Sequence, residues 1–179
     1  MGKIILITGG ARSGKSSFAE KYVARCGKKI AYIATAQALD DEMRQRINKH
    51  RERRPASWHT IEAPFAAEKA IDACHDYDTI LFDCLTVYLS NIICQPHLEK
   101  ASNQNREQEI FTALHKLIKA AKKHEQTTVF VTNEVGSGIV PENELARQYR
   151  DAAGMCNQYT ARQADEVYLA VAGIPVQLK

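Results

Sequence analysis

The chain has 179 residues, 45% of them hydrophobic, and a formal net charge of +3. This length suits one α/β domain, which we expect to span residues 1–179, and the weak charge gives no reason to expect nucleic acid as a partner. No apolar run approaches the ~18 to 20 residues of a membrane-spanning helix. The five cysteines are dispersed and lack the spacing of zinc ligands. We therefore expect a cytoplasmic protein with reduced thiols and no membrane span.

The first predicted elements flank a phosphate-binding loop. Residues 3–8 form a β-branched run typical of a strand, and Phe18, Tyr22 and Val23 recur at helical spacing after the loop. The segment between them matches the pattern G-x-x-x-x-G-K-[ST] at every fixed position, and it consists of Gly9, Gly10, Ala11, Arg12, Ser13, Gly14, Lys15 and Ser16. A chance glycine turn between a strand and a helix would not require Lys-Ser after the second glycine.

The fixed residues of this loop each have a chemical reason. Gly9 and Gly14 allow successive backbone N–H groups to point at phosphate oxygens, and the helix that follows adds its own free N–H groups. Lys15 would reach the β- and γ-phosphates, and the Ser16 hydroxyl would be a ligand of Mg²⁺. The sequence therefore predicts a site for a nucleoside triphosphate with Mg²⁺.

A basic helix is expected after a second strand at residues 30–34. Asp40 or Asp41 can cap this helix, which ends before Pro55. One stripe of the helix holds Leu39, Met43, Ile47 and His50. Cations border the stripe, namely Arg44, Arg46, Lys49, Arg51, Arg53 and Arg54. Such a run fits a solvated helix face, and it also fits a set of guanidinium partners for phosphate.

A carboxylate ends the next buried strand. Residues 56–62 are predicted to be a connection anchored by Trp58, and a short helix is expected at 65–74. The apolar strand at 79–83 then ends in Asp83. This carboxylate would be the second magnesium anchor beside Ser16, or it would serve only to cap a helix.

The rest of the chain continues the alternation of strands and helices. We expect a helix at 84–94, an irregular stretch at 95–106, a helix whose core stripe runs from Ile110 to Ala121, a strand at 128–132, a glycine loop at 133–141, a helix at 142–163, a strand at 167–171, and a turn at 173–175 into a short tail. The glycine loop is either a flexible loop over the ligand-binding edge or a connecting turn. This order predicts an α/β fold with a mainly parallel sheet between two helical layers.

Several of these segments together resemble one family. The chain is similar to the bifunctional adenosylcobinamide kinases and adenosylcobinamide-phosphate guanylyltransferases of cobalamin (vitamin B12) biosynthesis. The segments that carry this resemblance are the loop 9–16, residues 33–36, residues 46–51 with Arg54, Pro55 and Trp58, residues 83–86, residues 131–136 and 138–141, and Arg150, Asp151, Asn157 and Gln158. The phosphate loop is shared with many families, whereas the segments around His50 and at 132–141 are far more particular to this one.

The resemblance implies a RecA-like P-loop NTPase fold, a homotrimer and two reactions. The kinase would phosphorylate the aminopropanol hydroxyl of adenosylcobinamide with ATP or GTP. The guanylyltransferase would then pass GMP from GTP to adenosylcobinamide phosphate through a GMP-histidine intermediate, giving adenosylcobinamide-GDP.

The resemblance also implies roles for individual residues. The guanylylated histidine would be His50. Some relatives carry two adjacent histidines where this chain has Lys49 and His50, so only His50 can serve here. Lys15 would act in catalysis. The nucleotide site would comprise the loop together with Ala34, Thr35, Ala36, Arg51, Glu52, Arg53, Arg54, Glu62 and Asp83. A neutral imidazole is a competent nucleophile, and cations placed in advance stabilise phosphoryl oxygens.

Two alternatives from other classes remain open at the level of sequence. One is a small-molecule phosphate-loop kinase without a covalent step, in which His50 is structural. The other is a nucleotide-dependent switch or oligomeric ATPase without small-molecule turnover, although no basic and aromatic interleaved surface for nucleic acid is apparent.

Overall fold

The computed structural model describes residues 2–98 and 100–179, which form a helix–sheet–helix sandwich. The sheet has seven strands in the order β3-β2-β4-β5-β1-β6-β7. The strands are β1 (Lys3–Gly9), β2 (Ile30–Ala34), β3 (His59–Glu62), β4 (Thr79–Asp83), β5 (Thr127–Val131), β6 (Glu166–Val171) and β7 (Ile174–Gln177). All neighbouring strands pair in parallel except β6 and β7, which are antiparallel. This is the mainly parallel α/β architecture of a P-loop NTPase-like fold, as predicted.

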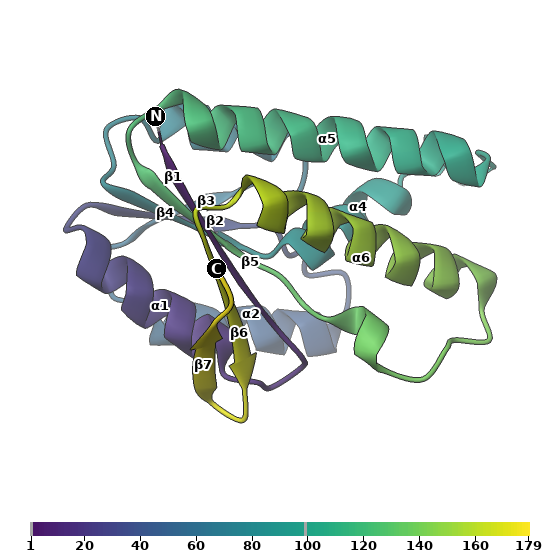
Figure 1. Cartoon of the computed structure of the whole chain (residues 1–179), viewed down its shortest axis with the longest axis horizontal. Helices are drawn as coiled ribbons and strands as arrows, with labels where there is room; N and C mark the ends of the chain where they lie inside the picture. Colours follow the sequence, from purple (N-terminus) through teal and green to yellow (C-terminus); the bar gives the residue numbers. More distant parts are fainter. Residues whose placement is uncertain (1, 99) are drawn as a thin grey trace.

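Helices cover both faces of this sheet (Figure 1). They are α1 (Lys15–Cys26), α2 (Asp41–Arg53), α3 (Ala67–Ala73), α4 (Leu85–Ile93), α5 (Asn103–Lys123) and α6 (Glu144–Gln163), with short 3₁₀ helices η1 (Pro96–Leu98) and η2 (Val135–Ser137). Helices α1 and α2 lie on one side of the sheet, and α5 and α6 lie on the other. None of the helices in the described part of the chain is long and apolar enough to cross a membrane.

The central strands are buried on both sides because both faces are covered by helices. On the side of α5 and α6, Phe82 packs against Tyr88 and Phe130 in one core cluster. On the side of α1, Ile5 and Ile7 belong to a second cluster. Strands buried on both faces are continuous apolar runs instead of alternating ones, which is why residues 79–83 and 128–131 were recognisable in the sequence.

Two strands and one helix boundary differ from the sequence prediction. The predicted connection at 56–62 contains β3, and the predicted tail after Gly173 contains β7. Both are edge strands with little buried surface, so they lack the apolar pattern that identifies the others. The irregular stretch predicted at 95–106 is also shorter, because Ser102 caps α5 through the N–H of Asn105. Glu99, within that stretch, lies outside the described residues.

Parallel pairing brings four segments that are separate in the sequence to the same edge of the sheet. The phosphate loop follows β1, Thr35 follows β2, Cys84 follows β4, and Asn133 comes shortly after β5. Ligands of open α/β sheets bind at this carboxyl edge. The fold therefore gathers the predicted site residues where the sequence analysis expects them.

Glu166 ties α1 to the sheet at some distance from that edge. Its carboxylate accepts hydrogen bonds from Lys3 Nζ at 2.5 Å, Tyr22 Oη at 2.8 Å and Tyr168 Oη at 2.7 Å. These donors, led by Lys3, lower the pKa of Glu166 to about 2. A carboxyl whose pKa is lower in the folded state stabilises that state at pH values above its usual pKa.

We predict that Glu166→Gln lowers the free energy of unfolding at pH 7 by about 1–2 kcal/mol. The difference from the unaltered protein should shrink as pH falls from about 5 toward 2, because the carboxyl of the unfolded chain takes up a proton in this range while the native carboxyl stays ionised down to about pH 2. Urea unfolding at pH 7 and at pH 3.5 measures it. A difference that stays constant with pH would contradict this assignment.

Candidate functional site

The phosphate loop is held in shape by its own glycines and by the far end of the chain. Gly14 precedes α1 with φ of 92°, a conformation that disfavours any side chain. A β-carbon at Gly14 would also lie 2.9 Å from the Cα of Gly173, in the turn between β6 and β7. The N–H of Gly173 donates to the carbonyl of Ser13 at 2.9 Å. The β6–β7 turn therefore supports the loop directly.

Lys15 folds back over the loop that contains it. Its Nζ donates to the carbonyl of Gly10 at 2.9 Å. Partial burial lowers the pKa of Lys15, and the nearby Cys84 and Asp83 oppose that shift. The ammonium group thus lies between the loop backbone and the end of β4, where it can serve phosphate oxygens.

Asp83 sits at the centre of the site. Its Oδ2 accepts a hydrogen bond from Tyr32 Oη, and His50 Nδ1 lies 3.9 Å from the same oxygen. Because both contacts involve Oδ2, the oxygen available to a metal ion is Oδ1. Burial strongly raises the pKa of the Tyr32 phenol, and the negative charge of Asp83 raises it further.

The residues present fit a magnesium ion held in part by substrate. Ser16 and Asp83 line the same cavity and offer oxygen ligands. Among the described residues, no group of three or more His, Cys, Asp or Glu side chains is placed to hold a metal. Mg²⁺ commonly uses one or two protein ligands and completes its shell with phosphate oxygens and water, so this sparse set suits it.

His50 lies in the last turn of α2 and borders the same cavity. No group in the described ranges lies within hydrogen-bond distance of its buried Nδ1. The cavity, of about 1130 Å³, brings His50 together with Lys15, Ser16 and Asp83. The structure thus places the predicted histidine beside the phosphate loop.

The apolar stripe of α2 faces this cavity instead of the core. Met43 and Ile47 line the cavity with His50. The prediction was wrong for Leu39, which precedes the Asp40 cap of α2 and is 79% exposed. No residue of α2 is buried. The helix is therefore held over the sheet by a few side-chain contacts, most of them near its C-terminal end.

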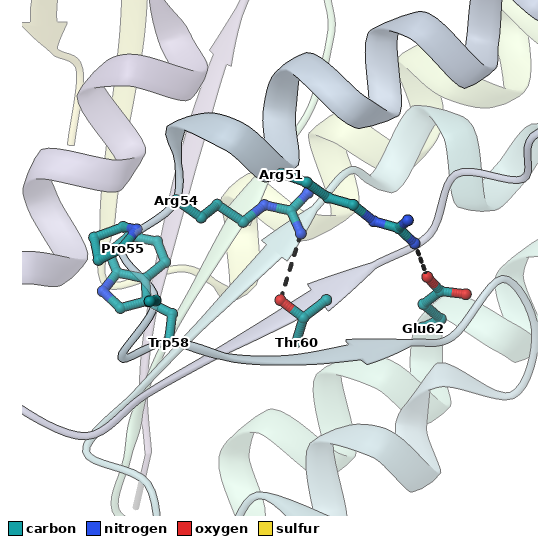
Figure 2. Close-up of a pocket in the computed structure, with 7 residues that line it drawn as sticks. Arg51, Arg54, Pro55, Trp58, Thr60 and Glu62 are labelled. Carbon is teal, nitrogen blue, oxygen red and sulfur yellow. Dashed lines mark hydrogen bonds and ion pairs between the residues drawn. The ribbon is translucent and has the colours of Figure 1, made fainter.

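Those contacts come from the arginines that follow His50 (Figure 2). Arg51 pairs with Glu62 at the end of β3. The Arg54 guanidinium lies over the Tyr32 ring, 3.4 Å from its centroid, and its Nη1 is 3.5 Å from Thr60 Oγ1. A second hollow of about 480 Å³ lies beside the main cavity, and its lining includes Arg51, Arg54, Trp58, Thr60 and Glu62.

Most of the predicted nucleotide residues meet at the main cavity. Its lining includes Ala11, Arg12, Ser13, Gly14, Lys15, Ser16, Ala34, Ala36, His50, Arg51, Arg53, Arg54, Glu62 and Asp83. Four others lie differently. Gly9 and Gly10 form the start of the loop, Glu52 is exposed on α2, and Thr35 is fully buried. The Thr35 hydroxyl donates to the carbonyl of Asp83 at 3.0 Å, so it supports the end of β4.

The segment after β5 supports the loop from the other side. The N–H of Glu134 donates to the carbonyl of Gly9 at 3.2 Å. Its carboxylate accepts from Thr8 Oγ1 and from Asn157 Nδ2, the latter at 3.1 Å. Neither Glu134 nor Tyr32 could be given a role from the sequence, because the partner of a polar group after a strand or inside an apolar run comes from another element.

We predict that Gly14→Ala weakens nucleotide binding by about 10- to 100-fold, since the alanine must adopt a strained φ against Gly173. Titration of a fluorescent GTP analogue measures the affinity. Gly154→Ala on α6 is the matched control, because its added methyl group meets nothing within 4 Å. Equal affinity of the Gly14→Ala variant and the unaltered protein would contradict the prediction.

Comparison with known proteins extends over nearly the whole chain. Residues 5–178 match the family model described as cobinamide kinase / cobinamide phosphate guanyltransferase. The bifunctional adenosylcobalamin biosynthesis protein CobU of Escherichia coli (strain K12) is 42% identical over 181 residues, which cover 98% of this chain and 99% of the relative. CobU of Salmonella typhimurium (strain LT2) is 44% identical, with 98% and 99% covered. The bifunctional protein CobP of Pseudomonas aeruginosa (strain PAO1) is 39% identical, with 97% and 96% covered.

These matches confirm the resemblance seen in the sequence. The family joins a kinase activity and a guanylyltransferase activity, both of which use nucleotide substrates. The chain belongs to the cobinamide kinase / cobinamide phosphate guanyltransferase family of transferases.

Proposed function

We propose that this chain catalyses two successive transfers at one nucleotide site. It first phosphorylates the aminopropanol hydroxyl of adenosylcobinamide with ATP or GTP. It then transfers GMP from GTP through His50 to the phosphorylated product, giving adenosylcobinamide-GDP. The observation that carries the proposal is that His50, Lys15 and Asp83 line one cavity in a chain of this family.

The kinase step uses the phosphate loop. Backbone N–H groups between Gly9 and Ser16 bind the phosphates, and Lys15 neutralises charge on the β- and γ-oxygens. Ser16 and Asp83 would hold Mg²⁺, which when bound supplies further charge neutralisation on the phosphates. The cobinamide hydroxyl oxygen forms a bond to the γ-phosphorus and loses its proton to water, while the bond from the γ-phosphorus to the bridging oxygen breaks and the nucleoside diphosphate leaves.

The guanylyl step uses His50 as a nucleophile. We assign the imidazole proton to Nδ1, whose neighbour is the Asp83 carboxylate 3.9 Å away, so that the lone pair lies on Nε2. Nε2 forms a bond to the α-phosphorus of GTP, and pyrophosphate leaves with the electrons of the bond that breaks. A phosphate oxygen of the cobinamide phosphate then displaces the imidazole, so one hard transfer becomes two easier ones.

The arginines after His50 supply positive charge that is already oriented. Arg51 is held by Glu62, and Arg54 is held against the Tyr32 ring. Donors that are fixed before the reaction stabilise the charge of the transition state without the cost of reorganisation. We assign these arginines, with Arg53, to the phosphates and ribose of GTP.

The main cavity is large enough for more than a nucleotide. Its volume of about 1130 Å³ exceeds the ~300–1,000 Å³ usual for ligand pockets. We propose that the aminopropanol arm of the second substrate enters the same space. From the length and the dispersed cysteines we also propose a single domain and a cytoplasmic location. From the family resemblance we propose a homotrimer, which sedimentation analysis tests.

We predict that α-labelled GTP leaves label on the denatured protein, and that acid releases it as expected of a phosphoramidate. His50→Gln should abolish the label. His59→Gln is the matched control, because His59 is an exposed imidazole on β3 outside the cavity lining, and it should retain the label. If the unaltered protein retains no label, the covalent step is wrong and a simple kinase remains.

We predict that Lys15→Ala lowers both activities by at least about 100-fold, whereas His50→Ala removes guanylyl transfer and spares the kinase. Mass analysis of the phosphate and GDP products from adenosylcobinamide measures each step. Lys21→Ala, at an exposed position on α1, is the control and should retain both. Loss of kinase activity in a folded His50→Ala variant would contradict the assignment of His50 to guanylyl transfer alone. If the unaltered protein is folded but forms neither product, a nucleotide-dependent switch is favoured instead.

A further inference from the structure

Tyr32 borders the proposed catalytic site, and the two reactions above use only its ring, as a support for Arg54. It is the third residue of β2 and only 2% exposed. Its ring packs in the core cluster under α1, while part of it borders the main cavity. A tyrosine that served only to fill the core would make no specific contacts with catalytic residues. The hydroxyl and the ring face of Tyr32 both contact residues of the proposed catalytic site.

The hydroxyl of Tyr32 holds the magnesium carboxylate. It donates its single proton to Asp83 Oδ2. The backbone carbonyl of Asp83 is held separately by Thr35 Oγ1 at 3.0 Å. The hydroxyl therefore fixes the rotation of the carboxylate and directs Oδ1 away from the phenol.

The ring face of Tyr32 holds Arg54. The guanidinium carbon lies 3.4 Å from the ring centroid, which is close contact for a cation and an aromatic face. The other contact of Arg54 is weak, since Nη1 is 3.5 Å from Thr60 Oγ1. The buried Nε has no hydrogen-bond partner within the described ranges. The ring is thus the main feature that positions this guanidinium.

Arg54 in turn positions the end of α2. It is the C-cap residue of this helix, and His50 lies one turn before it. Because α2 buries no residue, the location of its last turn depends on contacts such as Arg54 with Tyr32 and Arg51 with Glu62. His50 Nδ1 approaches the same Asp83 oxygen that Tyr32 binds.

We propose that Tyr32 is a positioning residue for both transfers, holding the Asp83 carboxylate with its hydroxyl and the Arg54 guanidinium with its ring. This inference rests on the proposed function, since it takes Asp83 as the metal ligand and His50 as the guanylylated residue. The two contacts use different parts of the side chain, so two substitutions can separate them.

Tyr32→Phe removes the hydroxyl and keeps the ring. We expect about tenfold weaker Mg²⁺ activation of the kinase, because a group that orients a metal ligand commonly contributes this much. Labelling of His50 at saturating Mg²⁺ should stay within about twofold, since Arg54 keeps its contact. Tyr32→Leu removes both contacts, and we expect labelling of His50 to fall at least about tenfold further.

Mn²⁺ provides a readout that does not depend on turnover. Electron paramagnetic resonance measures Mn²⁺ binding to the protein with a non-hydrolysable GTP analogue, and Tyr32→Phe should weaken it about tenfold. Tyr88→Phe is the matched control, because Tyr88 is equally buried and its hydroxyl lies 3.4 Å from the N–H of Ala67, away from the cavity. It should leave Mn²⁺ binding and both activities unchanged.

The outcomes separate this inference from the proposed function. If the unaltered protein makes both products and Tyr32→Phe binds Mn²⁺ as tightly as Tyr88→Phe does, the positioning role is wrong and the function stands. If both phenylalanine variants lose the same fraction of every activity, Tyr32 is only a packing residue. If the unaltered protein makes neither product, the proposed function itself is wrong.

Discussion

The parallel pairing of β4, β5 and β1 is the constraint on which the site depends. Parallel strands of one sheet end at the same edge, so the loop after β1 and Asp83 at the end of β4 become neighbours although 67 positions or more separate them in the sequence. The helices that connect these strands must cross over the faces of the sheet, which buries the strands and makes their register rigid. The carboxyl edge of the sheet is therefore rigid, and the side chains that follow each strand determine the chemistry of the site.

Charged groups at this edge are held by partners on several different elements. Lys15 is bound by its own loop, Arg51 by Glu62 of β3, and Arg54 by the ring of Tyr32 in β2. A side chain with such a partner loses less conformational entropy when a substrate binds. The arrangement favours a site in which the cations are oriented before the nucleotide arrives. Helix α2, which carries His50 and Arg51, has no buried residue that would fix it equally well.

The sequence was most informative where the chemistry is local. The phosphate loop could be recognised because a strand, a fixed pattern and a helix follow one another within a short segment. Asp83 was a candidate because it ends a buried apolar strand. The role of His50 could be predicted only in part. The pattern of its helix also fitted a solvated surface, and the role itself came from resemblance to a family. Tyr32 could not be recognised, because its partners Asp83 and Arg54 come from other elements. The edge strands β3 and β7 were missed because exposed strands carry no apolar pattern.

The contact between Gly14 and Gly173 has a consequence for the order in which the protein is assembled. The phosphate loop precedes its neighbours in the sequence, because the strands on both sides of β1 are β5 and β6, and the turn that supports Gly14 follows β6. In a chain synthesised from its N-terminus, the loop therefore emerges well before the segments that hold its shape. Nucleotide can stabilise the nascent chain through this loop only after β5, β6 and the turn at Gly173 have joined it.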